Sequence, residues 1–140
     1  MFARRHRAGS IVMAVIVMVC LYGSVPVEAQ SEQVVEVTIK DFTFITKQTA
    51  LRLGVPTTIR IMNLDGQRHD FGSTMFEGIP TRIEHDGVFF YGRGVGGVML
   101  DPKRDVTIRF DTSRPGSHRF QCSIHPDMKG ELLLLMVEAV

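Results

Sequence analysis

Residues 120–130 contain three side chains that could bind one metal ion together. Cys122, His125 and Met128 supply a thiolate, an imidazole and a thioether at even spacing. Copper suits this set, because Cu(I) prefers soft sulfur, Cu(II) accepts imidazole, and a cysteine with two histidines and a weak methionine is a blue-copper arrangement. A second histidine must then come from another part of the chain. His69, which follows a turn-rich segment after a strand-like run, is the candidate.

Each of these side chains has a simpler explanation when it is taken alone. His69 could be a hydrogen-bonded histidine at a strand end, Met128 a core methionine, and His125 a loop residue stiffened by Pro126. A lone cysteine in an exported protein is commonly a free thiol or part of an intermolecular disulfide. Their combination on one loop favours a metal site. Zinc is the nearest alternative to copper, but a thioether is a poor zinc ligand.

The spacing Cys-x-x-His-x-x-Met resembles the ligand loop of the cupredoxins, the small blue copper proteins, and in particular of the amicyanin type. The resemblance covers residues 34–140 and implies one type 1 copper ion, cycling between Cu(I) and Cu(II), with His69, Cys122, His125 and Met128 as ligands. Many cupredoxins have asparagine directly after the first ligand histidine, where it braces the ligand loop. This chain has Asp70 at that position, so whether this residue braces the ligand loop stays an open question at the level of the sequence.

Transfer of single electrons between redox partner proteins is the function that such a site implies. Four protein ligands leave no open position for a substrate, so we expect that the protein is not an enzyme. A binuclear centre would need a second bridging cysteine, and multicopper oxidases use several His-x-His pairs, which this sequence lacks. Two alternatives stay open: a protein that binds, stores or delivers copper, and a metal-free β-sandwich that serves as a binding module.

The first 29 residues have the pattern of a secretory signal peptide. Basic residues at positions 4, 5 and 7 precede an almost entirely apolar run over residues 11–21, and Val27-Glu28-Ala29 precedes the expected cut. An uncleaved anchor is the alternative, but the run is shorter than the roughly 20 residues of a membrane-spanning helix. We therefore expect a periplasmic or otherwise exported protein without stable membrane insertion, in which residues 30–140 form one copper-binding domain.

Charge and length limit the partners and the number of domains. The chain has 140 residues with 16 Lys or Arg and 15 Asp or Glu, and loss of residues 1–29 leaves 13 against 14. This near-neutral balance does not favour nucleic acid or a strongly charged partner. About 110 residues can bury one core without disulfides. Cys20 leaves with the signal peptide, and we expect the remaining domain to be a monomer.

Alternating apolar residues predict the strands that hold the ligands. The alternation is clear at residues 35–39, 51–55, 59–62 and 106–110. On a further strand His118 and Cys122 share one face, but they lie roughly 13 Å apart along the chain, so His118 is too far away to bind the same metal. Several short strands and no helical period predict an all-β, antiparallel Greek-key β-sandwich.

Two regions are predicted with less regular structure. Asn63 and Asp65 read as turn residues before His69. Residues 76–102 are rich in glycine and are expected to be a long, functional loop. In that loop His85 is expected to be a solvent-exposed residue and Met99 a core residue rather than copper ligands. Its aromatic segment, residues 89–91, is expected to cover the sandwich or to offer an apolar contact surface.

Overall fold

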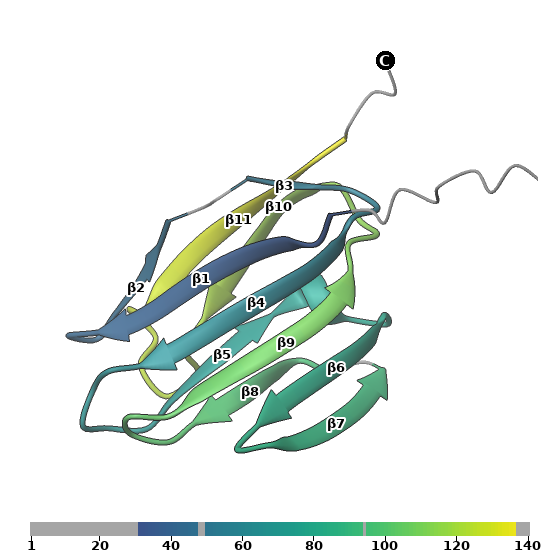
Figure 1. Cartoon of the computed structure of the whole chain (residues 1–140). Helices are drawn as coiled ribbons and strands as arrows, with labels where there is room; N and C mark the ends of the chain where they lie inside the picture. The colour runs from purple at the N-terminus through teal and green to yellow at the C-terminus, as the bar shows by residue number, and fades with distance from the viewer. Residues whose placement is uncertain (1–30, 48–49, 94, 137–140) are drawn as a thin grey trace, which may run out of the picture.

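Two β-sheets packed face to face form the part of the chain that the computed structural model describes, residues 31–47, 50–93 and 95–136 (Figure 1). The six-stranded sheet contains, in spatial order, β2 (Thr43–Thr46), β1 (Gln33–Lys40), β4 (Pro56–Asn63), β9 (Asp105–Asp111), β6 (Pro80–His85) and β7 (Val88–Arg93). The five-stranded sheet contains β3 (Ala50–Arg52), β11 (Lys129–Leu135), β10 (Gly116–Gln121), β5 (His69–Ser73) and β8 (Gly97–Leu100). A 3₁₀ turn, η1 (Thr74–Phe76), follows β5.

The β-sandwich expected from the sequence is confirmed, and both of its sheets are mixed. Most neighbouring strands are antiparallel, but β1 pairs parallel with β4, and β3 pairs parallel with β11. The chain leaves the β1–β2 hairpin, crosses to β3 at the edge of the other sheet, and returns as β4 beside β1 (Figure 1). No helix in the described ranges is long and apolar enough to cross a membrane. The predicted signal peptide, residues 1–29, lies outside the described residues.

A cluster of aromatic side chains fills the core near the start of β5 and the end of β10. The rings of Phe71 and Phe120 stack with centroids 4.9 Å apart, and Phe44 meets both rings edge-on at 5.8 and 5.2 Å. All three are buried, and burial of one such side chain contributes about 1.5–3 kcal/mol. Phe120 also lies over Gly130, where a Cβ would run into its ring. This packing fixes the strands from which the predicted ligands project.

The prediction of a long loop over residues 76–102 is wrong. Strands β6, β7 and β8 occupy most of this stretch, and Asp86 and Gly87 join β6 to β7 in a two-residue turn with φ of 48° and 76°. An Asp-Gly pair adopts this turn readily because both positions need positive φ. The glycines at 96 and 97 do not prevent pairing either: a Cβ at Gly97 would lie 2.6 Å from the carbonyl oxygen of Phe71, so the close approach of β8 to β5 requires glycine.

Candidate metal centre

The four predicted ligands come from one strand and one loop of the five-stranded sheet. His69 is the first residue of β5, Cys122 directly follows β10, and His125 and Met128 lie in the loop that leads to β11. Strands β10 and β5 are paired, with Gln121 opposite Gly72, so the loop after β10 lies beside the start of β5. Sheet pairing therefore joins two segments that are more than 50 residues apart in sequence.

His69, Cys122 and His125 form a compact cluster. The Cys122 sulfur lies 3.9 Å from His69 Nδ1 and 3.6 Å from His125 Nδ1, and all three candidate ligand atoms lie within 4.8 Å of one another. Metal bonds of about 2.0–2.3 Å place neighbouring nitrogen and sulfur ligands roughly 3.8 Å apart in a trigonal plane. Two of the side chains are buried and His125 is partly exposed. The spacing therefore suits one ion bound by all three.

The loop from Cys122 to Met128 is closed by its own backbone. The Cys122 N–H donates to the Met128 carbonyl at 3.1 Å, and the Met128 N–H donates to the His125 carbonyl at 2.9 Å. The Met128 side chain is buried. These two bonds hold Cys122 and Met128 at adjacent ends of one tight turn, and both side chains are buried although the residues between them are largely exposed. Whether Met128 is a ligand stays a prediction.

Asp70 braces the loop from the neighbouring strand. Its backbone N–H points at the Cys122 sulfur, with N and S 3.5 Å apart, and its carboxylate accepts a hydrogen bond of 2.6 Å from the Ser123 N–H. The question that the sequence left open is thereby answered: an aspartate stands where many cupredoxins have asparagine, and it contacts the same loop. Its carboxylate also places a negative charge beside the cysteine.

Asp65 holds the other side of the His69 ring. Its carboxylate oxygen Oδ2 lies 2.9 Å from His69 Nε2, which leaves Nδ1 directed toward Cys122. The same carboxylate accepts hydrogen bonds from the backbone N–H groups of Asp41 at 2.7 Å and Phe42 at 3.1 Å. A carboxylate at the far nitrogen of a metal-binding histidine fixes its tautomer and increases its basicity.

Asn63 orders the turn that presents Asp65. It is fully buried, its amide donates to the carbonyls of Gln67 and Asp101 at 2.8 and 3.1 Å, and its oxygen accepts from the Asp65 N–H at 3.0 Å. The turn prediction is correct for Asp65, whereas Asn63 is the last residue of β4. The prediction misses their action on His69, because only the position of the turn was visible in the sequence.

Phe42 covers both histidine rings. It contacts His69 and His125 edge-on, with centroids 5.5 and 5.0 Å apart, and the two imidazoles are 4.8 Å apart. Phe42 and Asp41 form the β1–β2 turn with φ of 57° and 51°, a conformation that is rare for a bulky residue. Asp65 stabilises this turn, and Phe42 remains 46% exposed. No sequence pattern indicates that this phenylalanine belongs to the site.

Comparison with known proteins identifies the fold. No family model and no curated protein matches the sequence. A multi-copper oxidase from Pediococcus acidilactici matches 81% of this chain with a TM-score of 0.58 and 12% identity. A multicopper oxidase from Campylobacter jejuni matches 80% with a TM-score of 0.55 and 14% identity. A reduced amicyanin mutant has a TM-score of 0.46 at 16% identity, over 71% of this chain and 80% of its own.

The chain has a cupredoxin-like fold. It spans only 29% and 31% of the two oxidases.

The donor set of this cupredoxin-like chain fits copper better than zinc. The cluster offers one sulfur and two imidazole nitrogens, with a buried methionine in the same loop. Imidazole suits copper as well as zinc, whereas a thioether adds a soft ligand that favours copper. Among the described residues, no other group of three or more histidine, cysteine or acidic side chains is placed to hold a metal ion.

The remaining residues considered as ligands lie elsewhere. His85 ends β6, where its Nδ1 lies 2.8 Å from the Asp105 carbonyl oxygen, and His118 lies 2.9 Å from the Arg114 carbonyl oxygen. Met99 is 53% exposed on β8, so the prediction that it packs in the core is wrong. Its strand, β8, is one of the two edges of the five-stranded sheet, and Met99 lies on the face opposite to that of the buried Leu100.

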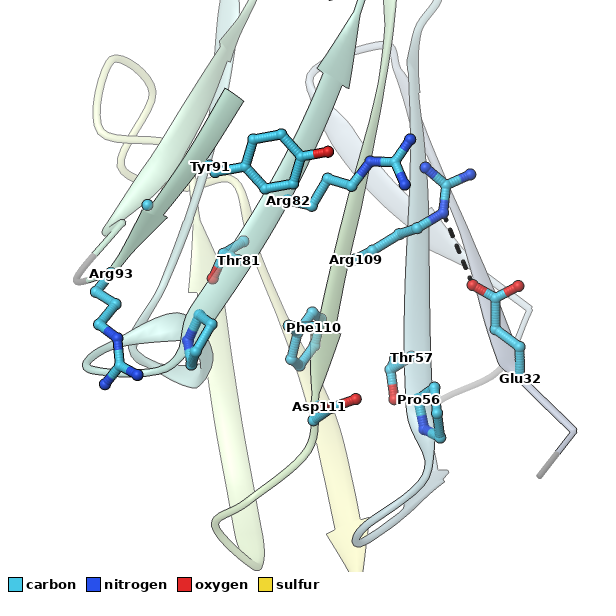
Figure 2. A pocket seen from close by; sticks show the side chains of 12 residues that line it. Glu32, Pro56, Thr57, Thr81, Arg82, Tyr91, Arg93, Arg109, Phe110 and Asp111 are labelled. Carbon is cyan, nitrogen blue, oxygen red and sulfur yellow. Dashed lines mark ion pairs between the residues drawn. The ribbon is translucent and has the colours of Figure 1, made fainter. Parts of the chain in front are cut away.

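A shallow trough of about 560 Å³ lies on the six-stranded sheet (Figure 2). Tyr91 and Arg82 lie close together on one wall, and Arg109, farther along, forms an ion pair of 3.8 Å with Glu32 (Figure 2). None of the residues that line the trough belongs to the metal cluster. The trough is therefore a separate feature of the surface.

Proposed function

We propose that this chain binds one copper ion as a type 1 centre and transfers single electrons between redox proteins. The observation that carries the proposal is the buried Cys122 sulfur, 3.6 and 3.9 Å from the Nδ1 atoms of two histidines, on a cupredoxin-like fold. His69, Cys122 and His125 would hold the ion, and Met128 would be a fourth, weaker ligand. Copper supplies a one-electron couple between Cu(I) and Cu(II) when it is bound.

The surrounding residues would keep the ligand atoms in place during electron transfer. Asp65 fixes the orientation of His69, and Asp70 and the backbone of the loop fix Cys122. A site whose ligands are already in position needs little rearrangement when the charge of the ion changes, which favours fast electron transfer. His125 is the partly exposed ligand. It is therefore the side chain through which we expect an electron to pass to a docked redox protein.

We also propose that the protein acts outside the cytoplasm and is not an enzyme. The export proposal rests on the signal-peptide pattern of residues 1–29. The second proposal rests on the four-ligand set, which leaves no open position for a substrate. The described part of the chain contains one candidate metal cluster, whereas an oxidase with several copper ions would require additional ligands.

Spectra of the purified protein after addition of Cu(II) test the proposal. We expect an intense visible absorption band from thiolate-to-copper charge transfer and the electron paramagnetic resonance signal of a type 1 site. Both should disappear in Cys122→Ser and in His125→Ala. His118→Ala removes a histidine that lies outside the cluster and is the matched control, with unchanged spectra.

Two results would redirect the interpretation. Copper that binds tightly without the thiolate band would support storage or delivery of the ion, since redox cycling through Cys122 would then be absent. Protein that binds no copper at all would support a metal-free binding module. A blue or green protein that loses its colour in Cys122→Ser but not in His118→Ala would support the electron-transfer proposal.

A further inference from the structure

Strand β7 is a free edge of the six-stranded sheet. Among the residues that the structure describes, it pairs on one side only, with β6, and it lies at the open margin of the sandwich (Figure 1). Its side chains Val88, Phe89, Phe90 and Tyr91 are 52%, 45%, 55% and 74% exposed. A strand with free backbone groups and apolar side chains on both faces is a template for pairing with another strand.

The other three sheet edges are better protected than β7. Strands β2, β3 and β8 have only four, three and four residues, and short edge strands offer few groups for pairing. Strand β7 has six residues, contains no proline, and has one charged residue, Arg93, at its end. We propose that the chain forms a two-fold dimer in which β7 pairs antiparallel with β7 of a second copy, in place of the monomer expected from the sequence.

The pairing of β7 with β6 determines which backbone groups are free. A two-residue turn at residues 86–87 makes Val88 and its β6 neighbour a hydrogen-bonded pair, and such pairs alternate along an antiparallel ladder. The N–H and C=O groups of Phe89 and Tyr91 therefore point away from β6. A two-fold axis at Phe90 places Phe89 opposite Tyr91 of the second copy, where both residues have free backbone groups.

The same register matches the side chains. Phe90 lies opposite Ile83 of β6, whose side chain packs against the core, so Phe90 is on the inward face and would meet Phe90 of the second copy. Phe89 and Tyr91 are on the outer face and would meet each other across the interface. Aromatic pairs of this kind stabilise antiparallel sheets. An axis at either neighbouring residue would place Phe90 opposite a valine or a glycine instead.

The positions of the charged residues, and the contacts that order the aromatic side chains of β7, support the same antiparallel dimer. Antiparallel pairing brings Arg93, at one end of β7, to the end of the second copy where Asp86 lies, whereas parallel pairing would bring the like charges together. On the outer face the Arg82 guanidinium lies 4.2 Å from the centroid of Phe89 and 6.0 Å from that of Tyr91. Figure 2 shows Arg82 beside Tyr91. These contacts order the aromatic side chains before a second copy binds.

Sedimentation equilibrium and light scattering of the purified protein over a dilution series test the dimer. We expect twice the monomer mass for the wild type and the monomer mass for Phe90→Lys, because two ammonium groups would meet at the axis. Ile45→Lys is the matched control: Ile45 is 49% exposed on β2, the opposite edge of the same sheet, and its variant should remain a dimer. Circular dichroism verifies that both variants are folded.

Cross-linking of copper-free protein gives a second readout that does not depend on the lysine variant. Residues directly opposite in a non-hydrogen-bonded pair have Cα atoms about 4.5 Å apart, which suits a disulfide. Phe90→Cys should therefore form a cross-linked dimer on mild oxidation, while Ile45→Cys and the wild type should not. A wild type that is monomeric at every concentration, or equal cross-linking of the two cysteine variants, would overturn the proposal. Both readouts are independent of copper.

Discussion

Asp65 controls His69 from the side of the ring that faces away from Cys122. Burial alone would raise the pKa of Asp65, but hydrogen bonds from the backbone N–H groups of Phe42 and Asp41, together with His69, outweigh it and hold the pKa below its usual value of 3.8. A carboxyl group with a lowered pKa in the folded state stabilises the fold above its usual pKa. That contribution is lost as the pH falls toward the folded-state pKa.

We predict that Asp65→Asn destabilises the copper-free protein near neutral pH and that this cost shrinks in acid. Above the usual pKa the wild-type carboxylate is charged in both the folded and the unfolded chain, and its hydrogen bonds favour the folded chain. Below it the unfolded chain takes up a proton first, so the advantage of the wild type decreases. Urea unfolding of both proteins from about pH 6 to about pH 3 measures the difference.

Phe42→Leu is the control, because it changes a neighbour of His69 and keeps the carboxylate. Its unfolding free energy should run parallel to that of the wild type over the same pH range. A difference between Asp65→Asn and the wild type that stays constant or grows in acid would show that the Asp65 charge is not responsible.

At Met128 we predict a change in potential without loss of the metal. Met128→Leu keeps a buried apolar side chain but removes an electron-pair donor. The more highly charged Cu(II) loses more from this than Cu(I), so the reduction potential of the copper should rise. The rise is about 59 mV for each tenfold loss of Cu(II) affinity relative to Cu(I). Redox titration of the visible band measures it. Met99→Leu, on the exposed side of β8, is the control and should leave the potential unchanged. Loss of copper from Met128→Leu would show that Met128 is more than a weak ligand.

The brace between β5 and the loop after β10 depends on one side chain, Asp70. We predict that Asp70→Ala lowers the unfolding free energy of the copper-free protein by about 1 kcal/mol, because the Ser123 N–H loses its acceptor. Asp70→Asn keeps an oxygen at that position and should cost less. Urea unfolding measures both changes, and Asp127→Ala, which removes an exposed carboxylate of the same loop, is the control with little effect.

The charge of Asp70 can be separated from its hydrogen bond. In Asp70→Asn the loop remains braced while a negative charge near Cys122 is removed, so the copper potential should rise because a nearby negative charge favours Cu(II). Equal destabilisation by alanine and asparagine would contradict the brace. An unchanged potential in Asp70→Asn would show that the charge does not act on the metal.

Strands and loops were predicted correctly where the pattern of neighbouring residues determines them. They were missed where pairing with a distant strand determines them. Alternation at residues 35–39 and 106–110 identified β1 and β9, and the spacing of Cys122, His125 and Met128 identified the loop, because both are properties of neighbouring residues. The parallel pairing of β1 with β4 depends on a crossover that no local pattern encodes. The β6–β7 hairpin could have been found from its Asp-Gly turn, but the glycines around it favoured a loop.

Around His69, too, the residue whose type carries the chemistry was predicted, and the residues whose role depends on the fold were missed. The histidine itself was predicted, since its residue type carries the chemistry. Asp65 and Phe42 were not, because a carboxylate in a turn and a phenylalanine in a hairpin acquire their role only when the two turns meet in the folded chain. Asn63 was likewise predicted to be only a turn residue, although its amide links the turn to the backbone carbonyls of Leu100 and Asp101.

At the scale of the whole molecule, the candidate metal centre connects both sheets. His69 starts β5 of the five-stranded sheet, and Cys122 and His125 lie in the loop between its strands β10 and β11. The β1–β2 turn of the other sheet reaches the site through Phe42, which covers both histidine rings and whose N–H donates to Asp65. An ion bound there would tie β5 to the loop after β10 and support the contact with that turn. Unfolding of either sheet would release it, so its binding energy should stabilise the entire domain.

We therefore predict a large rise in melting temperature when copper binds. A ligand at 100 times its Kd stabilises the folded state by about 2.7 kcal/mol. For a domain of this size each kcal/mol corresponds to about 4–8 °C, so the rise should be about 10–20 °C. Differential scanning calorimetry with and without copper measures it, and Cys122→Ser should lose most of the rise. If the wild type melts at the same temperature in both conditions, the cluster does not bind copper tightly, because an ion held by β5 and the loop after β10 could not leave the stability of the sandwich unchanged.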